Sequence, residues 1–244
     1  MSGSLRGQLQ FFHSTRARPC PYLQGRFERS IAAELDGPDA QDLYDTACLA
    51  GFRRSHGFIY RPACPNCDSC VPVRVVARDF VPRRTLQRIR RANGDVTSTE
   101  RPALATKEQY ALFMQYQRVR HASEKLDSGM DRMTFADYTA MVEESPIDTR
   151  LIEHRLPDGM LIAGMLCDRV ADGLSAVYSF FKPDLDERSL GSHMILDLIE
   201  RARRDGLPHV YLGFWIADTP KMSYKARFRP IEALGPDGWR LLPD

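Results

Sequence analysis

The sequence has 244 residues and a mass of 27.8 kDa, with 43% hydrophobic residues, 27% charged residues and a formal net charge of +2. This composition is typical of a globular protein that buries a core, and the longest uncharged stretch, residues 206–217, is too short to cross a bilayer as a helix. With no apolar signal core near the N-terminus, these features exclude a membrane protein, a disordered chain and a disulfide-stabilised secreted mini-domain, and they predict a cytoplasmic protein.

The basic residues are mostly arginine: five are lysines and 29 are arginines. Codon composition accounts for such a bias without any function, but arginine is also the residue that binds phosphates and carboxylates through two hydrogen bonds. Seven arginines and a single acid lie between Arg74 and Arg91. This segment is expected to be either a solvated basic face or a surface for the phosphates of a nucleic acid.

The first half of the chain is predicted to form a helix, a cysteine-bearing turn region and a strand. Apolar residues spaced at i, i+3, i+4 and i+7 predict a one-sided helix over residues 40–54. Turn-forming residues dominate 61–71, and alternating residues predict a short strand over 71–76.

A domain boundary is predicted in the polar segment 92–105, which contains Asn93-Gly94 and Pro102. We therefore divide the chain into an N-terminal domain of residues 1–100 and a C-terminal domain of residues 101–244.

The C-terminal domain is predicted to begin with two helices. Thr106 and Gln109 form a capping-box pattern, and Thr134 with Asp137 forms a looser N-terminal signature. Three strands are then expected over residues 150–156, 160–170 and 174–181, separated by Asp-Gly turns that favour an antiparallel meander. A helix over 189–204, ended by Gly206, and a last strand over 209–216 complete the series.

This order of a meander, a helix and one further strand resembles the acetyltransferase-like (GNAT) fold. The predicted fold class is therefore α+β, with a GNAT-like C-terminal domain beside a smaller, cysteine-bearing N-terminal α+β domain. In that fold the loop before the helix binds a pyrophosphate through backbone N–H groups at the helix N-terminus. Here this loop contains Arg188 and Gly191, which match half of the fold's signature; alternatively, Gly191 only allows close packing of the helix.

Three cysteines, Cys64, Cys67 and Cys70, are spaced so that their thiolates can converge on one metal ion, and Cys20 is the natural fourth ligand. The spacing predicts a structural zinc or iron–sulfur site, and the alternative is a set of reduced, packed thiols. Cys48 and Cys167 lie on apolar faces and are expected in the core.

Four stretches together are similar to the bacterial aminoacyl-tRNA–protein transferases of the N-degron pathway, within the arginyl-tRNA–protein transferase superfamily. The stretches are Cys20-Pro-Tyr-Leu-Gln-Gly-Arg26, Gly51-Phe-Arg-Arg-Ser55 with Tyr60-Arg-Pro62, Cys70-Val-Pro-Val-Arg74, and Tyr211–Ile216 with Lys221–Pro230. The resemblance, strongest to the leucyl-transferring branch, implies transfer of leucine from leucyl-tRNA to proteins that begin with Asp or Glu, which marks them for degradation. Leu23 stands where eukaryotic relatives carry a second early cysteine.

The residues fit this reaction, because an aminoacyl ester is already activated and its attack by an amine needs placement and oxyanion stabilisation more than a strong base. No Ser–His–Asp triad is apparent, and no cofactor is required for the chemistry; His121, His154, His193 and His209 are expected to be surface or packing residues. The catalytic candidates are Tyr178, Ser179, Lys221 and Tyr224. Candidates for binding the acidic acceptor or the tRNA are Arg53, Arg54, Arg61, Arg74, Arg188, Gly191, Trp215, Lys225 and Arg227.

Three alternatives stay open at the level of sequence. The donor could be arginyl-tRNA rather than leucyl-tRNA. The protein could be an acetyl-CoA-dependent N-acetyltransferase that uses the Arg188/Gly191 loop, or a non-catalytic RNA-binding module, although the Lys221–Pro230 segment has no purpose in the last account.

Overall fold

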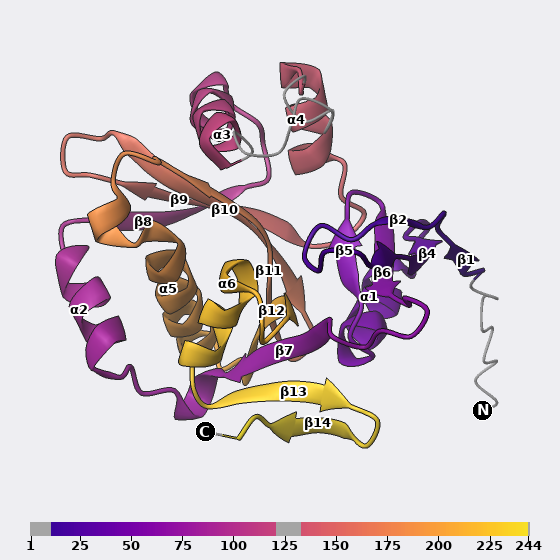
Figure 1. The fold of residues 1–244 in the computed structure, drawn as a ribbon. Coiled ribbons are helices and arrows are strands. Elements are labelled where there is room, and N and C mark those ends of the chain that lie inside the picture. Colours follow the sequence, from indigo (N-terminus) through magenta and orange to yellow (C-terminus); the bar gives the residue numbers. More distant parts are fainter. Residues whose placement is uncertain (1–10, 121–132, 244) are drawn as a thin grey trace, which may run out of the picture.

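A computed structural model describes residues 11–120 and 133–243 of the protein. Its centre is an eight-stranded mixed sheet with strand order β14-β13-β7-β12-β11-β10-β9-β8 (Figure 1). The strands are β7 (Val71–Val76), β8 (Thr97–Pro102), β9 (Thr149–Arg155), β10 (Leu161–Val170), β11 (Gly173–Phe181), β12 (His209–Trp215), β13 (Ile231–Gly235) and β14 (Gly238–Leu241). Within the described ranges, no helix is long and apolar enough to span a membrane.

The meander and the strand that follows it are confirmed. β9, β10 and β11 pair antiparallel, and α5 (Leu190–Arg204) then leads into β12, which pairs with β11 in parallel. These elements begin and end within two residues of their predicted bounds. The chain is therefore an α+β protein with the GNAT-like arrangement that the sequence predicts.

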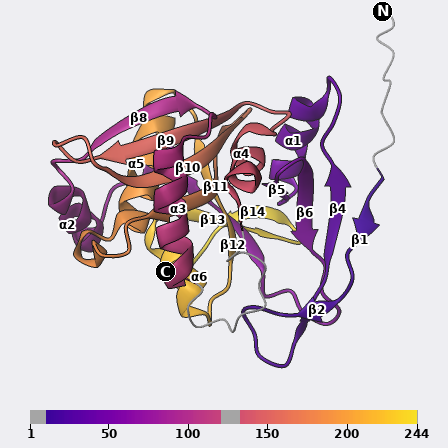
Figure 2. The ribbon, with the colours of Figure 1, turned by 90° about the horizontal axis from the view of Figure 1, so that it is seen from above.

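Helices cover both faces of the sheet. α5 packs on one face, where its Met194, Leu198 and Ile199 join the main core, and α2 (Arg84–Ala92) lies outside it (Figure 1). α3 (Lys107–Arg120) and α4 (Phe135–Glu143) lie on the other face, around a second core that includes Phe113 and Phe180 (Figure 2).

The two predicted helix caps are confirmed. The backbone N–H of Thr106 donates to Gln109, whose own N–H donates to the Thr106 hydroxyl, and Thr134 with Asp137 forms the same reciprocal pair. Each pair satisfies two backbone donors that the first helical turn leaves without partners.

The N-terminal part forms a separate four-stranded sheet of order β1-β4-β6-β5, beside α1 (Ala40–Leu49). Its strands are β1 (His13–Ser14), β4 (Ser30–Glu34), β5 (Arg53–Ser55) and β6 (Phe58–Pro62), and β2 (Arg18–Pro19) pairs with β3 (Phe27–Glu28) nearby. The four-stranded sheet and α1 pack around an apolar cluster that also includes Val170 and Tyr211 of the central sheet, and they lie to one side of that sheet (Figure 2).

The predicted helix over residues 40–54 is wrong at its C-terminal end, because the helix ends at Leu49. Gly51 has a φ of +79°, and a Cβ atom there would lie 2.6 Å from Leu234 Cδ2. This left-handed residue turns the chain so that residues 53–55 form β5 instead of a further helical turn.

The strand predicted over residues 71–76 is confirmed as β7, but it lies in the middle of the central sheet, between β13 and β12. The predicted boundary near residue 100 falls inside β8, which pairs with β9. The central sheet thus takes strands from both sides of that boundary.

Candidate active site

The candidate site lies where β11 and β12 separate. The two strands pair in parallel only from Gly173 to Ser175, opposite residues 209–211. On β12 the register then shifts between Tyr211 and Gly213, and Gly213 has a φ of +74°. Such a bulge changes the direction of a strand, so a wedge opens between β11 and β12 beyond this point.

Arg53, from β5, reaches into this wedge. Its Nη2 donates to the carbonyl oxygens of Ala176 and Val177 on β11, at 2.7 Å and 3.0 Å. Its Nη1 is buried and has no hydrogen-bond partner. Arg53 thereby supplies donors to carbonyl groups that lie beyond the end of the β11–β12 pairing.

A cavity of about 430 Å³ opens from the wedge. Its lining comes from β11, from the N-terminus of α5 and from the segment after β12, which forms α6 (Pro220–Ser223) and a short 3₁₀ helix (Tyr224–Arg227). The four catalytic candidates Tyr178, Ser179, Lys221 and Tyr224 all line it, as do Gly191, Arg53 and Lys225. The structure thus brings together residues that are far apart in the sequence.

Lys225 is a buried cation at this cavity, with 8% of its surface exposed. Its Nζ donates to the backbone oxygen of Phe214 at 2.5 Å. Burial, and next the charge of Arg53, lower its pKa to about 7. Within the described residues neither Lys225 nor Arg53 forms an ion pair with a carboxylate.

Two of the predicted acceptor-binding arginines are instead structural, which corrects the prediction for them. Arg54 is fully buried and donates through Nε and Nη2 to both carboxylate oxygens of Asp168, at 2.7 Å each. Arg74 is bound to Glu232, at 2.7 Å, and to Asp172, at 3.2 Å. Neither guanidinium is at a surface that a substrate could reach.

The remaining sequence candidates lie in different places. Arg61 donates to the backbone oxygen of Ala50, and Arg188 forms two hydrogen bonds with Asp95. The Nε1 of Trp215 is buried with no hydrogen-bond partner, and its side chain packs against the main core. Arg227 is exposed and does not line the cavity.

Gly191 does line the cavity, at the N-terminus of α5. A Cβ atom at this position would meet Phe181 at 3.4 Å, which is ordinary van der Waals contact. Close helix packing therefore does not require glycine here, and its place at the cavity is the more informative observation.

The second half of the basic segment forms α2, whose Leu86 and Ile89 are buried while the side chains of Arg84, Arg88 and Arg91 are exposed. These three arginines form no ion pair with any described residue. At the end of the helix, Asn93 Nδ2 donates to the backbone oxygen of Arg188 at 2.8 Å. The C-terminal end of α2 therefore adjoins the loop that leads to the cavity.

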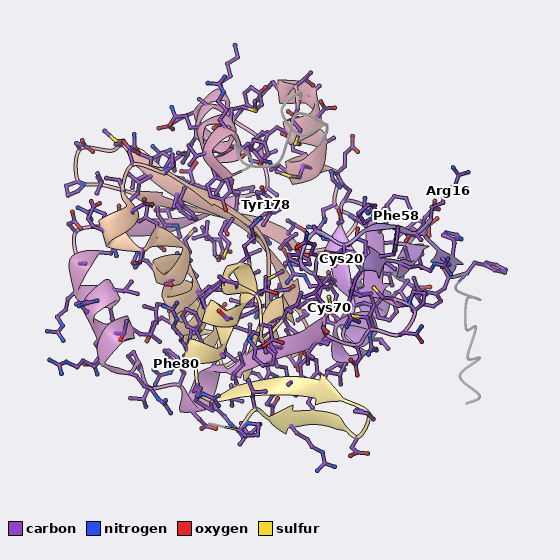
Figure 3. All side chains as sticks on the ribbon, in the orientation of Figure 1. Arg16, Cys20, Phe58, Cys70, Phe80 and Tyr178 are labelled. Atoms are coloured by element: carbon purple, nitrogen blue, oxygen red, sulfur yellow. The ribbon has the colours of Figure 1, made fainter. Side chains whose placement is uncertain are left out.

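Cys20, Cys64, Cys67 and Cys70 all line a second cavity, of about 760 Å³, in the N-terminal part of the chain. Figure 3 labels Cys20 and Cys70 there, and Tyr178 on the central sheet. Burial, and next the nearby Cys64, raise the pKa of Cys70 to about 11, whereas hydrogen bonding to Ser69 lowers the pKa of Cys67. In the part of the chain that the structure describes, no three Cys, His, Asp or Glu side chains are grouped so that they could hold a metal ion. The metal site stays a prediction.

Other expectations for single side chains are confirmed. Cys48 and Cys167 are buried in the core. No described histidine lines the cavity: His154 and His193 pack against each other, and His209 contacts Asp172. His121 lies outside the described residues.

Sequence reasoning missed how Arg53 and Lys225 are used. It named both among the candidates for binding the acidic acceptor or the tRNA, but it did not predict that both contact backbone oxygens at the wedge. One signal was present: Gly213 lies in the middle of a predicted strand, and an interior glycine there indicates a bulge or a close approach.

Comparisons with known proteins find similar sequences over nearly the whole chain. The family described as "Arginine-tRNA-protein transferase, C terminus" matches residues 108–235, and its "N terminus" counterpart matches residues 18–88. The chain is 55% identical over 230 residues to the aspartate/glutamate leucyltransferase of Paramagnetospirillum magneticum, covering 94% of this chain and 93% of that one. It is 49% identical over 243 residues to the protein of the same name from Parvibaculum lavamentivorans, covering 100% and 99%.

Among solved structures, L-PGS from Bacillus licheniformis has a similar fold, with a TM-score of 0.51. The match covers 66% of this chain and 57% of that one, at 12% sequence identity. This likeness concerns the fold alone.

Proposed function

Since the chain belongs to the arginine-tRNA–protein transferase family, we propose that it transfers leucine from leucyl-tRNA to the α-amine of proteins whose first residue is Asp or Glu. Curated relatives that are 48–55% identical over nearly the whole chain carry the name aspartate/glutamate leucyltransferase. The structural observation that carries the proposal is the cavity at the β11–β12 wedge, with two cations at its floor and no carboxylate paired with them among the described residues.

The reaction is aminolysis of an ester. The acceptor nitrogen bonds to the leucyl carbonyl carbon, the bond from that carbon to the 3′-oxygen of the tRNA breaks, and the proton lost by the amine balances the one gained by the 3′-oxygen. An α-amine has a pKa of about 7.7–8.0, so roughly a tenth of it is neutral at pH 7. Holding amine and ester together can therefore supply most of the acceleration, up to about 7–11 kcal/mol in well-aligned cases.

The cavity suits this task. Its volume of about 430 Å³ lies in the range of small-molecule sites. Tyr178, Ser179 and Tyr224 offer hydroxyl groups along its wall, and Lys221 offers an amine. These four side chains are our candidates for stabilising the tetrahedral oxyanion and for moving the proton.

The tRNA is proposed to lie along α2. Its exposed arginines Arg84, Arg88 and Arg91 suit the phosphates of an acceptor arm, and the contact between Asn93 and Arg188 sets the end of α2 beside the loop at the cavity. The aminoacyl end would then enter the cavity past the N-terminus of α5. An aminoacyl-tRNA donor also fits a cytoplasmic location.

The competing functions are less favoured. An N-acetyltransferase that uses acetyl-CoA would share the fold, but the names of the close relatives point to an aminoacyl donor. The same names favour leucine over arginine. A non-catalytic RNA-binding module would not account for a cavity that collects the Lys221 and Tyr224 side chains beside Tyr178.

A donor-swap assay tests the proposal. The protein is incubated with leucyl-tRNA, arginyl-tRNA or acetyl-CoA and with peptides that begin with Asp, Glu, Asn or Ala. We expect leucine on the Asp and Glu peptides only. Equal labelling of all four peptides, labelling of none, or saturable use of acetyl-CoA would overturn the proposal.

The role we propose for the cysteine loop is structural, because no step of this reaction requires a metal. Metal analysis of anaerobically purified protein tests it. About one zinc or one cluster per chain, lost in Cys67→Ser together with stability but not with acceptor preference, would support a structural metal. A metal-free protein that is fully active would contradict the structural metal and would leave the four cysteines a packing role only.

A further inference from the structure

The floor of the wedge holds two cations whose hydrogen-bond partners are backbone oxygens. Lys225 donates to the carbonyl of Phe214, and Arg53 donates to the carbonyls of Ala176 and Val177. Within residues 11–120 and 133–243, neither has a carboxylate partner. The Nη1 of Arg53 is buried and unpartnered as well.

Burial of these two charges without a carboxylate partner is costly in free energy. A charge removed from water is ordinarily paired with an opposite charge, and here a buried ammonium faces a second cation instead. The lowered pKa of Lys225 reflects both the burial and the charge of Arg53. A bound anion would relieve both effects at once.

Three of the other candidate arginines are already paired with carboxylates. Arg54 is held by Asp168, Arg74 by Glu232 and Asp172, and Arg188 by Asp95. Arg53 and Lys225 differ from them in that they line the cavity where the reaction is proposed to occur.

We propose that Lys225, together with Arg53, binds the side-chain carboxylate of the acceptor's N-terminal Asp or Glu. This inference rests on the proposed leucyl transfer. Lys225 Nζ donates to the carboxylate, and Arg53 contributes its charge and its unpartnered Nη1. Because the α-amine of Asp or Glu is only a few bonds from its side-chain carboxylate, this anchor also sets the amine in the same cavity as the leucyl ester.

The same pair accounts for rejection of Asn and Gln. A neutral amide cannot neutralise the two cations. Its NH₂ group is a hydrogen-bond donor, and it would meet the N–H donors of Lys225 and Arg53. Sites built to pair a particular polar group discriminate strongly against an analogue that lacks it. Lys225 and Arg53 are thus specificity-determining residues.

The test is the ratio of kcat/KM for an Asp-peptide to that for the matched Asn-peptide, measured with leucyl-tRNA. In Lys225→Met we expect kcat/KM for the Asp-peptide to fall by about 10- to 100-fold, as loss of a charged hydrogen bond would cause, with little change for the Asn-peptide. Lys225→Arg keeps the charge and should retain at least part of the preference. A purely structural defect would lower both values together and leave the ratio unchanged.

Arg16→Gln is the matched control, because Arg16 lines the cysteine-bearing cavity and not the wedge (Figure 3). It should leave the ratio unchanged. A collapse of the ratio in Arg16→Gln, with the ratio preserved in Lys225→Met, would place the carboxylate site in the other cavity and overturn the inference.

Different results would contradict the proposed function and the assignment of the carboxylate site. If the wild-type protein transfers no leucine to the Asp-peptide, the proposed function is wrong. If the wild type transfers leucine with a preference for Asp, and Lys225→Met and Arg53→Lys both keep that preference, only the assignment of the carboxylate site is wrong.

Discussion

The guanidinium of Arg53 lies directly against the backbone of Gly213, where a Cβ atom would stand 2.3 Å from Nη1. The bulge at Gly213 opens the wedge. Arg53 then occupies the space that a side chain at position 213 would take.

Gly213→Ala should therefore displace Arg53 and lower kcat/KM for Asp-peptides at least about tenfold. The positive φ of residue 213 adds a cost of roughly 1–3 kcal/mol in stability. Gly206→Ala is the control, since Gly206 has a φ of +70° but no atom within 4 Å of the added Cβ. Steady-state kinetics and urea unfolding of both variants check this, and equal losses of activity in the two would contradict it.

Acceptor preference should depend on pH. The pKa of Lys225 is about 7 because of burial and then Arg53, with the Cys70 thiol as the further titratable group acting on it. Only the protonated lysine attracts a carboxylate, so the Asp/Asn ratio of kcat/KM should fall as pH rises from about 7 to 9, while titration of the two acceptor amines largely cancels in the ratio. In Lys225→Arg the Asp/Asn ratio should not change between pH 7 and 9. A ratio that is also independent of pH in the wild type would contradict the prediction.

The ion pair between Arg54 and Asp168 should be essential for stability. Both side chains are fully buried, and Thr149 Oγ1 also donates to Asp168 at 2.7 Å. Asp168→Asn leaves the guanidinium unpaired and should cost about 3–5 kcal/mol, whereas the double variant Arg54→Met with Asp168→Leu should recover much of the loss. Urea unfolding of both variants measures this; a double variant as unstable as Asp168→Asn would contradict it.

Stability should fall in mild acid because of His193. Burial, and next His154, lower its pKa to about 4. Since the unfolded chain binds this proton near pH 6.5 and the folded chain does not, the free energy of unfolding falls as pH drops from about 6.5 to about 4, by at most ~1.4 kcal/mol per pH unit for one group. Urea unfolding between pH 7 and 4 should show a shallower decline in His193→Phe than in the exposed control His13→Gln. Identical slopes in the two would refute this.

Binding of aminoacyl-tRNA should become less dependent on salt when α2 loses its arginines. Each phosphate contact contributes about 0.7–0.9 to the slope of log affinity against log salt concentration. Replacing Arg84, Arg88 and Arg91 by Ala should therefore flatten the slope by about 2 to 3 and leave the Asp/Asn ratio intact. The exposed arginines Arg203, Arg204 and Arg240, replaced together, are the control. An unchanged slope in the α2 variant would mean that the tRNA lies elsewhere.

Local sequence patterns predicted much of the secondary structure of the C-terminal half. The meander β9–β11 and the helix α5 follow from alternation, Asp-Gly turns and helical spacing, all of which act between near neighbours in the sequence. The strand β8 was not predicted, because Thr97–Pro102 is polar and mostly exposed at the edge of the sheet, with no apolar alternation to reveal it.

The candidate site was predicted only as a set of residue types. Whether an arginine is a free cation or half of a buried ion pair depends on the acid that the fold brings to it, and Asp168 is 114 positions from Arg54. Nothing in the neighbourhood of Arg53 and Arg54 in the sequence distinguishes the first, which lies at the cavity, from the second, which lies in the core.

The position of β7 has a consequence for how the protein is made. β7, near residue 75, pairs on one side with β12 and on the other with β13, so its neighbours are synthesised more than 130 residues later. Contacts so distant in sequence form slowly, and an apolar strand without its neighbours is prone to aggregate. Val73 and Val75 therefore stay without their sheet neighbours until the ribosome has delivered residue 235, and β7 completes its pairing only when synthesis of the chain is nearly finished.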